Sequence, residues 1–163
     1  FLDDPVVFLE HKLLYYHLKA DRLPENNLPI GKARIARSGR HATLATYSAM
    51  LHESLKAADM IAEEGYQVEV VDLRTVKPID TDTILGSVAR TGRLLVVGEA
   101  FPWGGVSAEI IARVASEGFD LLDCPPKRLN AKDSPIPYHP NLWKVHRPIA
   151  ESIYHSLSQL VRL

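Results

Sequence analysis

The strongest fold signal in the sequence is the stretch Arg93-Leu-Leu-Val-Val-Gly-Glu-Ala-Phe-Pro-Trp-Gly-Gly105. Its apolar run, residues 94–97, is short, contains two β-branched residues and ends at Gly98, which is typical of a strand buried on both faces. A bulky turn and two glycines follow, and then a helical pattern begins. A buried strand that leads into a helix through a tight turn is the repeating unit of a parallel α/β sheet.

The same unit recurs on both sides of this stretch. Strands are expected at residues 6–9, 33–37 (a short edge strand), 42–47, 68–71, 94–97 and 127–130. Helices are expected from an N-cap at Ser48 to Gly65, then over 80–92, 106–118 and 148–163, and residues 133–146 are expected to be extended coil. This order predicts an α/β fold: a three-layer domain with a mostly parallel central sheet and helices on both faces.

Composition excludes several function classes. The 163 residues carry a formal net charge of -1, with a pI near 6.7, which gives no reason to expect nucleic acid or an anionic membrane as a partner. The single cysteine, Cys124, excludes an intrachain disulfide. No apolar run approaches the ~20 residues of a membrane span, and the first residues are not a signal peptide. Since they also lack a methionine, we expect the chain to belong to a longer protein.

Nucleotide binding is the first chemistry to consider for such a fold, but its phosphate turn requires glycines. The first turn, residues 46–50, contains no glycine. Asp72 stands where a ribose-binding carboxylate could lie, but without a glycine-rich phosphate turn it is better explained as a strand-end or helix-capping residue. The pair Gly104 and Gly105 at a helix N-terminus could hold an anion, but tight packing of the turn under Phe101 and Trp103 is the preferred explanation. Glu99, just past the central strand, is the one carboxylate in a position typical of α/β sites.

Other catalytic patterns are weaker. Ser107 lies inside a predicted helix and outside any nucleophile elbow. Cys124 has no apparent activating base. His139 and His146, with Asp133, lack the spacing of metal ligands, so no metal site is predicted. Taken alone, these residues define no active site.

Several motifs, in the correct order along the chain, resemble one family. It is the beta subunit of thiamine-diphosphate-dependent 2-oxo acid dehydrogenases, the decarboxylating component of the pyruvate and branched-chain complexes. The similar stretches are residues 5–16, 72–80, 91–100 and 104–110, with Lys127-Arg128 and residues 133–137. The stretch at 72–80 also resembles transketolase and deoxyxylulose phosphate synthase. A C-terminal domain of one of those enzymes, or a freestanding anion- or nucleotide-binding module, therefore remains an alternative.

The resemblance implies a division of the chain. Residues 1–16 would end a preceding pyrimidine-binding domain, residues 17–41 would form a linker and edge strand, and residues 42–163 would be a complete transketolase C-terminal-type domain. The parent would decarboxylate a 2-oxo acid and pass the acyl group to lipoamide. Thiamine diphosphate and magnesium would be held outside this chain, which would carry no catalytic, cofactor-binding or metal residue. One departure is Gly98, where many relatives have histidine.

The resemblance also implies partners and a location. The partners would be an alpha subunit, a second beta subunit and the acyltransferase of the complex. The location would be a bacterial cytoplasm or a mitochondrial matrix. The surface for the acyltransferase would lie near the C-terminus, on the helix from Pro148. Its candidate contact residues are Tyr154, His155, Leu160 and Leu163. Burial of this whole apolar set in the core is the competing interpretation.

Overall fold

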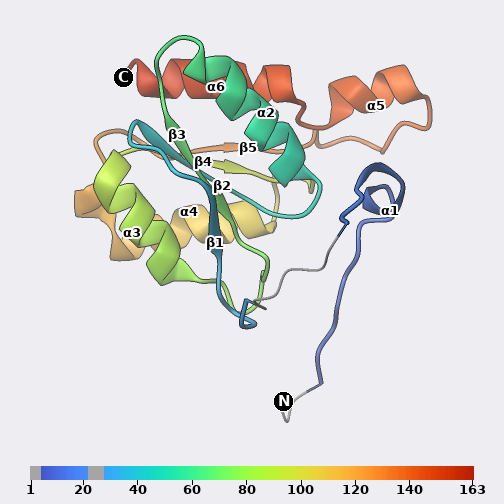
Figure 1. Cartoon of the computed structure of the whole chain (residues 1–163), viewed down its shortest axis with the longest axis horizontal. Helices are drawn as coiled ribbons and strands as arrows, with labels where there is room; N and C mark the ends of the chain where they lie inside the picture. The colour runs from blue at the N-terminus through green and yellow to red at the C-terminus, as the bar shows by residue number, and fades with distance from the viewer. Residues whose placement is uncertain (1–4, 22–27) are drawn as a thin grey trace.

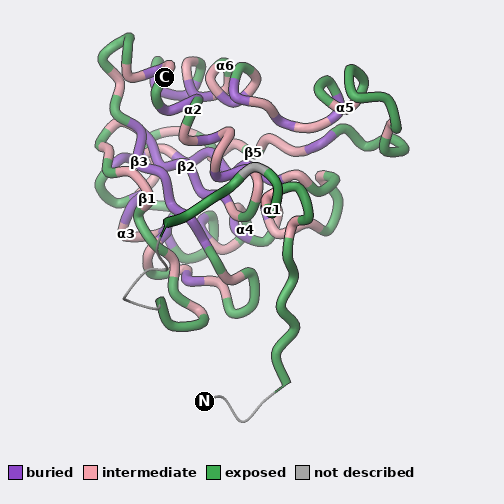
Figure 2. The backbone as a smooth tube through the Cα atoms, turned by 45° about the vertical axis from the view of Figure 1, so that its right-hand side comes forward, coloured by how far each residue is buried: buried purple, intermediate pink, exposed green. Residues whose placement is uncertain are grey.

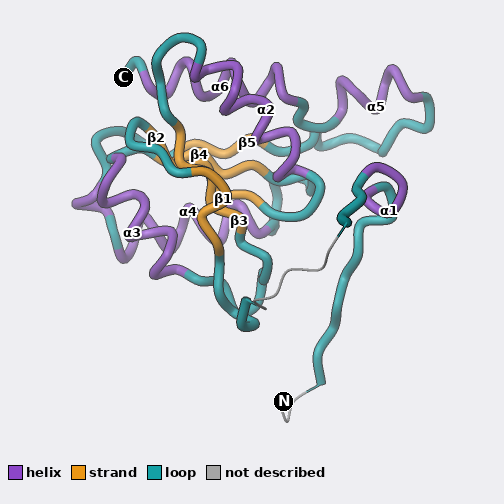
Figure 3. Tube along the Cα trace, in the orientation of Figure 1, coloured by secondary structure: helices purple, strands orange, loops and turns teal. Residues whose placement is uncertain are grey.

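The structure is a computed structural model of the whole chain and describes residues 5–21 and 28–163. A five-stranded sheet with the order β1-β3-β2-β4-β5 forms its centre (Figures 1 and 3). The strands are β1 (Arg34–Arg37), β2 (Ala42–Thr46), β3 (Val68–Asp72), β4 (Leu94–Val97) and β5 (Lys127–Leu129). Only the β1 pairing is antiparallel, and the other three are parallel. The predicted edge strand and mostly parallel sheet are therefore confirmed.

Helices cover both faces of the sheet (Figure 1). On one face lie α2 (Met50–Ala62) and α6 (Ala150–Val161), packed against each other. On the other lie α3 (Thr81–Thr91) and α4 (Val106–Glu117). Shorter helices are α1 (Leu14–His17), the 3-10 helix η1 (Phe119–Leu121) and α5 (Pro140–His146). The predicted three-layer architecture is confirmed, and none of the helices in the described residues is long and apolar enough to cross a membrane.

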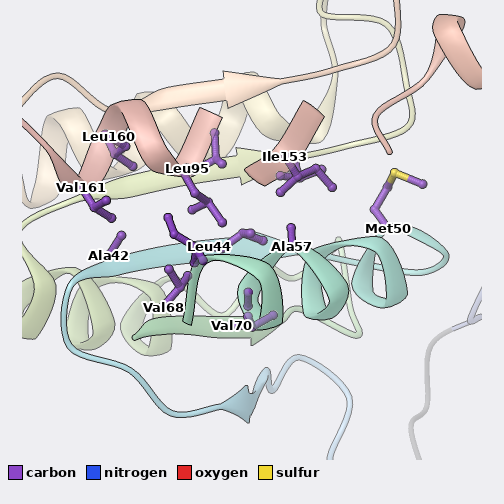
Figure 4. Close-up of a cluster of buried hydrophobic side chains, with 14 of the residues drawn as sticks. Ala42, Leu44, Met50, Ala57, Val68, Val70, Leu95, Ile153, Leu160 and Val161 are labelled. Carbon is purple, nitrogen blue, oxygen red and sulfur yellow. The ribbon is translucent and has the colours of Figure 1, made fainter. Parts of the chain in front are cut away.

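The central strands are apolar throughout because alternate side chains enter two different cores. In β4, Leu95 and Val97 pack in the core under α2 and α6, whereas Leu94 and Val96 pack in the core under α3 and α4. The first core also contains Leu44 and, from the C-terminal helix, three fully buried side chains (Figure 4). These are Ile153, Leu157 and Leu160. Figure 2 shows the buried strands at the centre of the domain.

The residues predicted to begin α3 and to end α2 and α3 do so in the structure. Asp80 caps α3, since its carboxylate accepts a hydrogen bond from the Thr83 backbone N–H at 3.2 Å. Gly92 ends α3 in the left-handed conformation, with φ of 66°. Gly65 follows α2 with φ of 88°.

Three predicted elements were wrong. Residues 6–9 form exposed coil, because a strand requires a neighbouring backbone and none of the described residues supplies one (Figure 2). Ser48 does not cap α2: its φ is 56°, and the N-cap is Ala49, without a side-chain hydrogen bond. Residues 133–146 are not all coil, since α5 begins at Pro140, whose ring suits the first position of a helix.

The turn at Gly39 should not tolerate a side chain. A Cβ there would lie 2.7 Å from the Gln67 carbonyl oxygen and would overlap the backbone of Val68 and Glu69. We expect Gly39→Ala to lower the free energy of unfolding by about 1–3 kcal/mol, measured by urea denaturation.

Gly86→Ala is the matched control, because the same substitution should act in the opposite direction. Gly86 lies inside α3, and its Cβ would meet nothing closer than the Arg90 Nη1 atom at 3.9 Å. Alanine loses less backbone entropy than glycine in a helix, so a gain of roughly 0.5–1 kcal/mol is expected. Equal losses at both positions would show that local geometry does not control these effects.

Candidate functional site

The sheet has a topological switch point between β2 and β4. From β2 the chain passes through α2 to β3 on one side, and from β4 it passes through α4 to β5 on the other. The two helices lie on opposite faces of the sheet (Figure 1). The carboxyl ends of β2 and β4 therefore border a crevice, which is where open α/β sheets bind their ligands.

A pocket of about 540 Å³ lies at this place. Residues that follow β2 and β4 line it, notably Tyr47 and Glu99. The N-terminal segment adds His11, whose Nε2 lies 3.0 Å from the Glu99 Oε2 atom. Burial, together with the neighbouring Glu99 carboxylate, raises the pKa of Tyr47, so its hydroxyl stays protonated at neutral pH and can donate a hydrogen bond.

The opposite wall of the pocket comes from α5 and the residue after it. His146 is only 6% exposed and stacks on Trp143, with ring centroids 6.2 Å apart. Phe101 meets His146 edge-on at 6.2 Å. The Arg147 guanidinium carbon lies 5.9 Å from the centroid of the Trp143 ring, within the range of a cation–π contact. The result is a largely aromatic wall with one cationic group.

The structure assembles this pocket from only part of the predicted set. Glu99 lines it, whereas Gly104 and Gly105 do not. Gly105 instead packs closely, since a Cβ there would lie 3.0 Å from the Phe101 carbonyl oxygen. Anion binding by these three residues stays a prediction. Asp72 contacts arginine: its Oδ2 lies 3.1 Å from Arg34 Nη2, as suits a strand-end residue.

Sequence reasoning missed most of the pocket. Tyr47 is the last residue of a predicted strand, and its place at the carboxyl end of that strand was the available signal. The contributions of His11, Trp143 and Arg147 come from segments far apart in the chain and carry no shared pattern. His146 was considered only as a metal ligand. Among residues 5–21 and 28–163, no three His, Cys, Asp or Glu side chains converge as metal ligands would.

The predicted contact residues of the C-terminal helix divide into two groups. His155 is exposed, Tyr154 is half-buried, and Leu163 is 67% exposed. Leu160 is fully buried against the sheet, so its inclusion in a partner surface was wrong (Figure 4). It falls on the inward stripe of α6 with Ile153 and Leu157, because positions three and four apart share one helix face.

Comparison with known proteins places this geometry in a family context. Residues 31–153 match the family model described as transketolase, C-terminal domain. The chain is 46% identical over 154 residues to the mitochondrial pyruvate dehydrogenase E1 component subunit beta-1 of Arabidopsis thaliana, a match that covers 92% of this chain and 42% of that protein. It is 39% identical over 160 residues to the pyruvate dehydrogenase E1 component subunit beta of Rickettsia bellii, covering 97% of this chain and 49% of the relative. The chain thus spans less than half the length of these relatives.

Solved structures show the same fold. A split-gene transketolase, described as an inactive beta4 tetramer, matches with a TM-score of 0.77 and 20% identity, over 90% of this chain and 47% of that one. A 2-oxoglutarate:ferredoxin oxidoreductase from Magnetococcus marinus matches with a TM-score of 0.54 and 10% identity, over 80% of this chain and 19% of that one. At these identities, the likeness concerns the fold alone.

Proposed function

This chain belongs to the transketolase C-terminal domain family, and we propose that it is the C-terminal part of the beta subunit of a 2-oxo acid dehydrogenase. The parent enzyme would decarboxylate a 2-oxo acid oxidatively and transfer the acyl group to lipoamide. Within it, this domain would hold subunits together and contact the acyltransferase core. Residues 1–16 would end a preceding pyrimidine-binding domain, and residues 17–41 would form the linker. Residues 1–4 and 22–27 of these segments lie outside the described residues.

One observation carries the proposal: identity of 39–46% to pyruvate dehydrogenase beta subunits extends over more than nine tenths of the chain. The transketolase structure shares the fold at only 20% identity. The sequence comparison therefore favours a 2-oxo acid dehydrogenase over a transketolase. Pyruvate is the favoured substrate for the same reason, ahead of a branched-chain 2-oxo acid. The plant relatives are named as mitochondrial, and the others are bacterial, which supports a matrix or bacterial cytoplasmic location.

Thiamine diphosphate and magnesium belong to the proposed parent reaction, but the described residues do not fit them. A magnesium diphosphate needs oxygen ligands and a turn in which backbone N–H groups approach the phosphates. The turn at residues 46–50 has no glycine, and no acidic cluster is present in the described part of the chain. We therefore assign no step of the reaction to this chain, and its inability to bind the cofactor alone stays a prediction for calorimetry.

The surface supports a role in assembly. Large apolar side chains are exposed on two segments that lie away from the central sheet, the N-terminal coil and the region of α5 (Figure 1). They include Val7, Phe8, Leu9, Tyr138, Leu142 and Val145. Exposed apolar patches of this kind mark protein contacts. Alpha and second beta subunits are the proposed partners, in a heterotetramer.

The activity is tested by producing the full-length subunit with its alpha partner and measuring 2-oxo acid decarboxylation with an artificial electron acceptor. We expect activity that depends on both subunits and on added thiamine diphosphate. Turnover of transketolase substrates, or of a 2-oxo acid by this chain alone, would contradict the proposal.

The contact with the acyltransferase is tested at the C-terminus. Leu163→Asp places a charge on an exposed apolar position beside α6 and should weaken acyltransferase binding at least about tenfold, while decarboxylation with the artificial acceptor stays unchanged. The control is Phe119→Asp, because Phe119 is 70% exposed on the opposite face of the sheet, beside α3 and α4. Equal binding by both variants and the unchanged protein would place the acyltransferase contact elsewhere.

A further inference from the structure

We propose that the pocket between the carboxyl ends of β2 and β4 binds a small monocarboxylate with an apolar, preferably aromatic, tail. Arg147 would pair with the carboxylate, and the aromatic wall would hold the tail. This inference concerns a binding site in the domain itself and does not rest on the proposed function.

Arg147 is the only arginine among the residues that line the pocket. The arginines at positions 34, 37, 74, 90, 93, 113 and 162 each lie within ion-pair distance of an Asp or Glu. Within the described residues, Arg147 has no carboxylate partner, although it is half-buried, and its Nε is buried without an acceptor. In the described part of the chain, Arg40 and Arg128 also have no Asp or Glu within ion-pair distance, but neither of them lines the pocket. A partly buried guanidinium with an unpaired N–H is stabilised by a bound anion, and its planar fork matches a carboxylate.

The contacts of Arg147 hold its guanidinium in place at the pocket. Its guanidinium carbon lies over the Trp143 ring, and this cation–π contact restricts the position of the guanidinium. Trp143 is in turn stacked on the buried His146, whose carbonyl oxygen accepts a hydrogen bond from the Lys132 backbone N–H at 2.9 Å. The cation is therefore positioned before any ligand arrives, which lowers the entropy lost on binding.

The rest of the lining selects the ligand class. Phe101, Ile136 and Trp143 offer apolar surface for a hydrocarbon or aromatic tail. The protonated Tyr47 hydroxyl offers a second donor. Glu99 also lines the pocket, and only one of its oxygens is engaged by His11. Its negative charge disfavours a second carboxylate or a phosphate, so a monoanion is preferred. The volume of about 540 Å³ suits a small molecule.

The test uses 4-fluorophenylacetate as the probe on the intact protein, with every chain that accompanies it, followed by ¹⁹F NMR line width. We expect saturable binding that benzoate displaces and succinate does not. The neutral amide, 4-fluorophenylacetamide, has nearly the same shape and should bind at least about tenfold more weakly, because it cannot form the charged pair with Arg147.

Two variants tie the probe to this pocket. Arg147→Gln should weaken binding of 4-fluorophenylacetate at least about tenfold, whereas Arg113→Gln, at a half-buried arginine paired with Glu109 on α4 and outside the pocket, should leave it unchanged. Should Arg147→Gln fail to fold, Ile136→Ser replaces it in the test. Ile136 lines the pocket and is 62% exposed, so this substitution should preserve the fold and lower the affinity for the aromatic probe. Absence of saturable binding, or binding by Arg147→Gln equal to that of the unchanged protein, would overturn the proposal.

Discussion

Ile153→Ala is expected to lower the free energy of unfolding by about 2–5 kcal/mol, because it removes three carbon atoms from a close-packed core. Ile153 is fully buried on α6 and lies in one cluster with Leu44 of β2 and Leu95 of β4 (Figure 4). The main chain on either side is held in a helix that packs on both α2 and the sheet, so the site cannot collapse to fill the cavity. Urea denaturation of the protein gives the measurement.

The control for this experiment is Leu163→Ala, two residues beyond the end of the same helix. Leu163 is 67% exposed, and substitutions at such surface positions change stability by roughly 0.5 kcal/mol or less. A small loss of unfolding free energy for Ile153→Ala, comparable with that for Leu163→Ala, would mean that α6 does not pack on the core as the structure shows. It would also remove the basis for treating Tyr154 and His155 as the outward face.

Asp80→Ala is expected to cost about 2–4 kcal/mol, because one buried carboxylate joins the start of α3 to the segment that precedes β1. Asp80 is 5% exposed and caps α3 through the Thr83 backbone N–H. It also accepts hydrogen bonds from the Ala33 backbone N–H at 3.0 Å and from the Thr83 hydroxyl at 2.8 Å. Alanine would remove the cap and leave the amide of Ala33, next to β1, without its acceptor.

The exposed control is Asp82→Ala, which alters only the favourable charge in the first turn of α3 and should cost about 0.3–1 kcal/mol. Denaturant titrations of both variants make the comparison. Similar losses at the two positions would show that the Ala33 and Thr83 contacts contribute little to stability.

The charge of Asp80 also predicts an acid dependence. Burial alone would raise the pKa of Asp80, but hydrogen bonds from Ala33 and Thr83 and the Lys32 charge together lower it below its ordinary value of 3.8. A carboxyl whose pKa is depressed by folding adds stability above its unfolded pKa and loses it as pH falls through the folded pKa. The stability difference between the unchanged protein and Asp80→Asn should therefore be constant at neutral pH and shrink below pH 3.8. A difference that grows on acidification would contradict this assignment.

Local sequence accounts for most of the fold. The run at residues 94–97 is a strand because its apolar side chains fill both cores, and the spacing of Ile153 and Leu157 forms the buried stripe of α6. Asp80 and Gly92 mark the ends of α3 through contacts within a few residues. Such signals can be read from sequence because the interactions that produce them are short in range or repeat with the helix or strand period.

The features of the fold and the pocket that the sequence did not predict depend on contacts between segments far apart in the chain. The strand expected at residues 6–9 had the right composition, but pairing needs a second backbone, and sequence pattern cannot supply one. Leu160 was open to either burial or partner contact until the packing of α6 showed it buried. In the pocket, only Glu99 was foreseen, because it sits beside its strand. His11 and Arg147 reach it from opposite ends of the chain, and that meeting exists only once the sheet and its flanking segments have folded together.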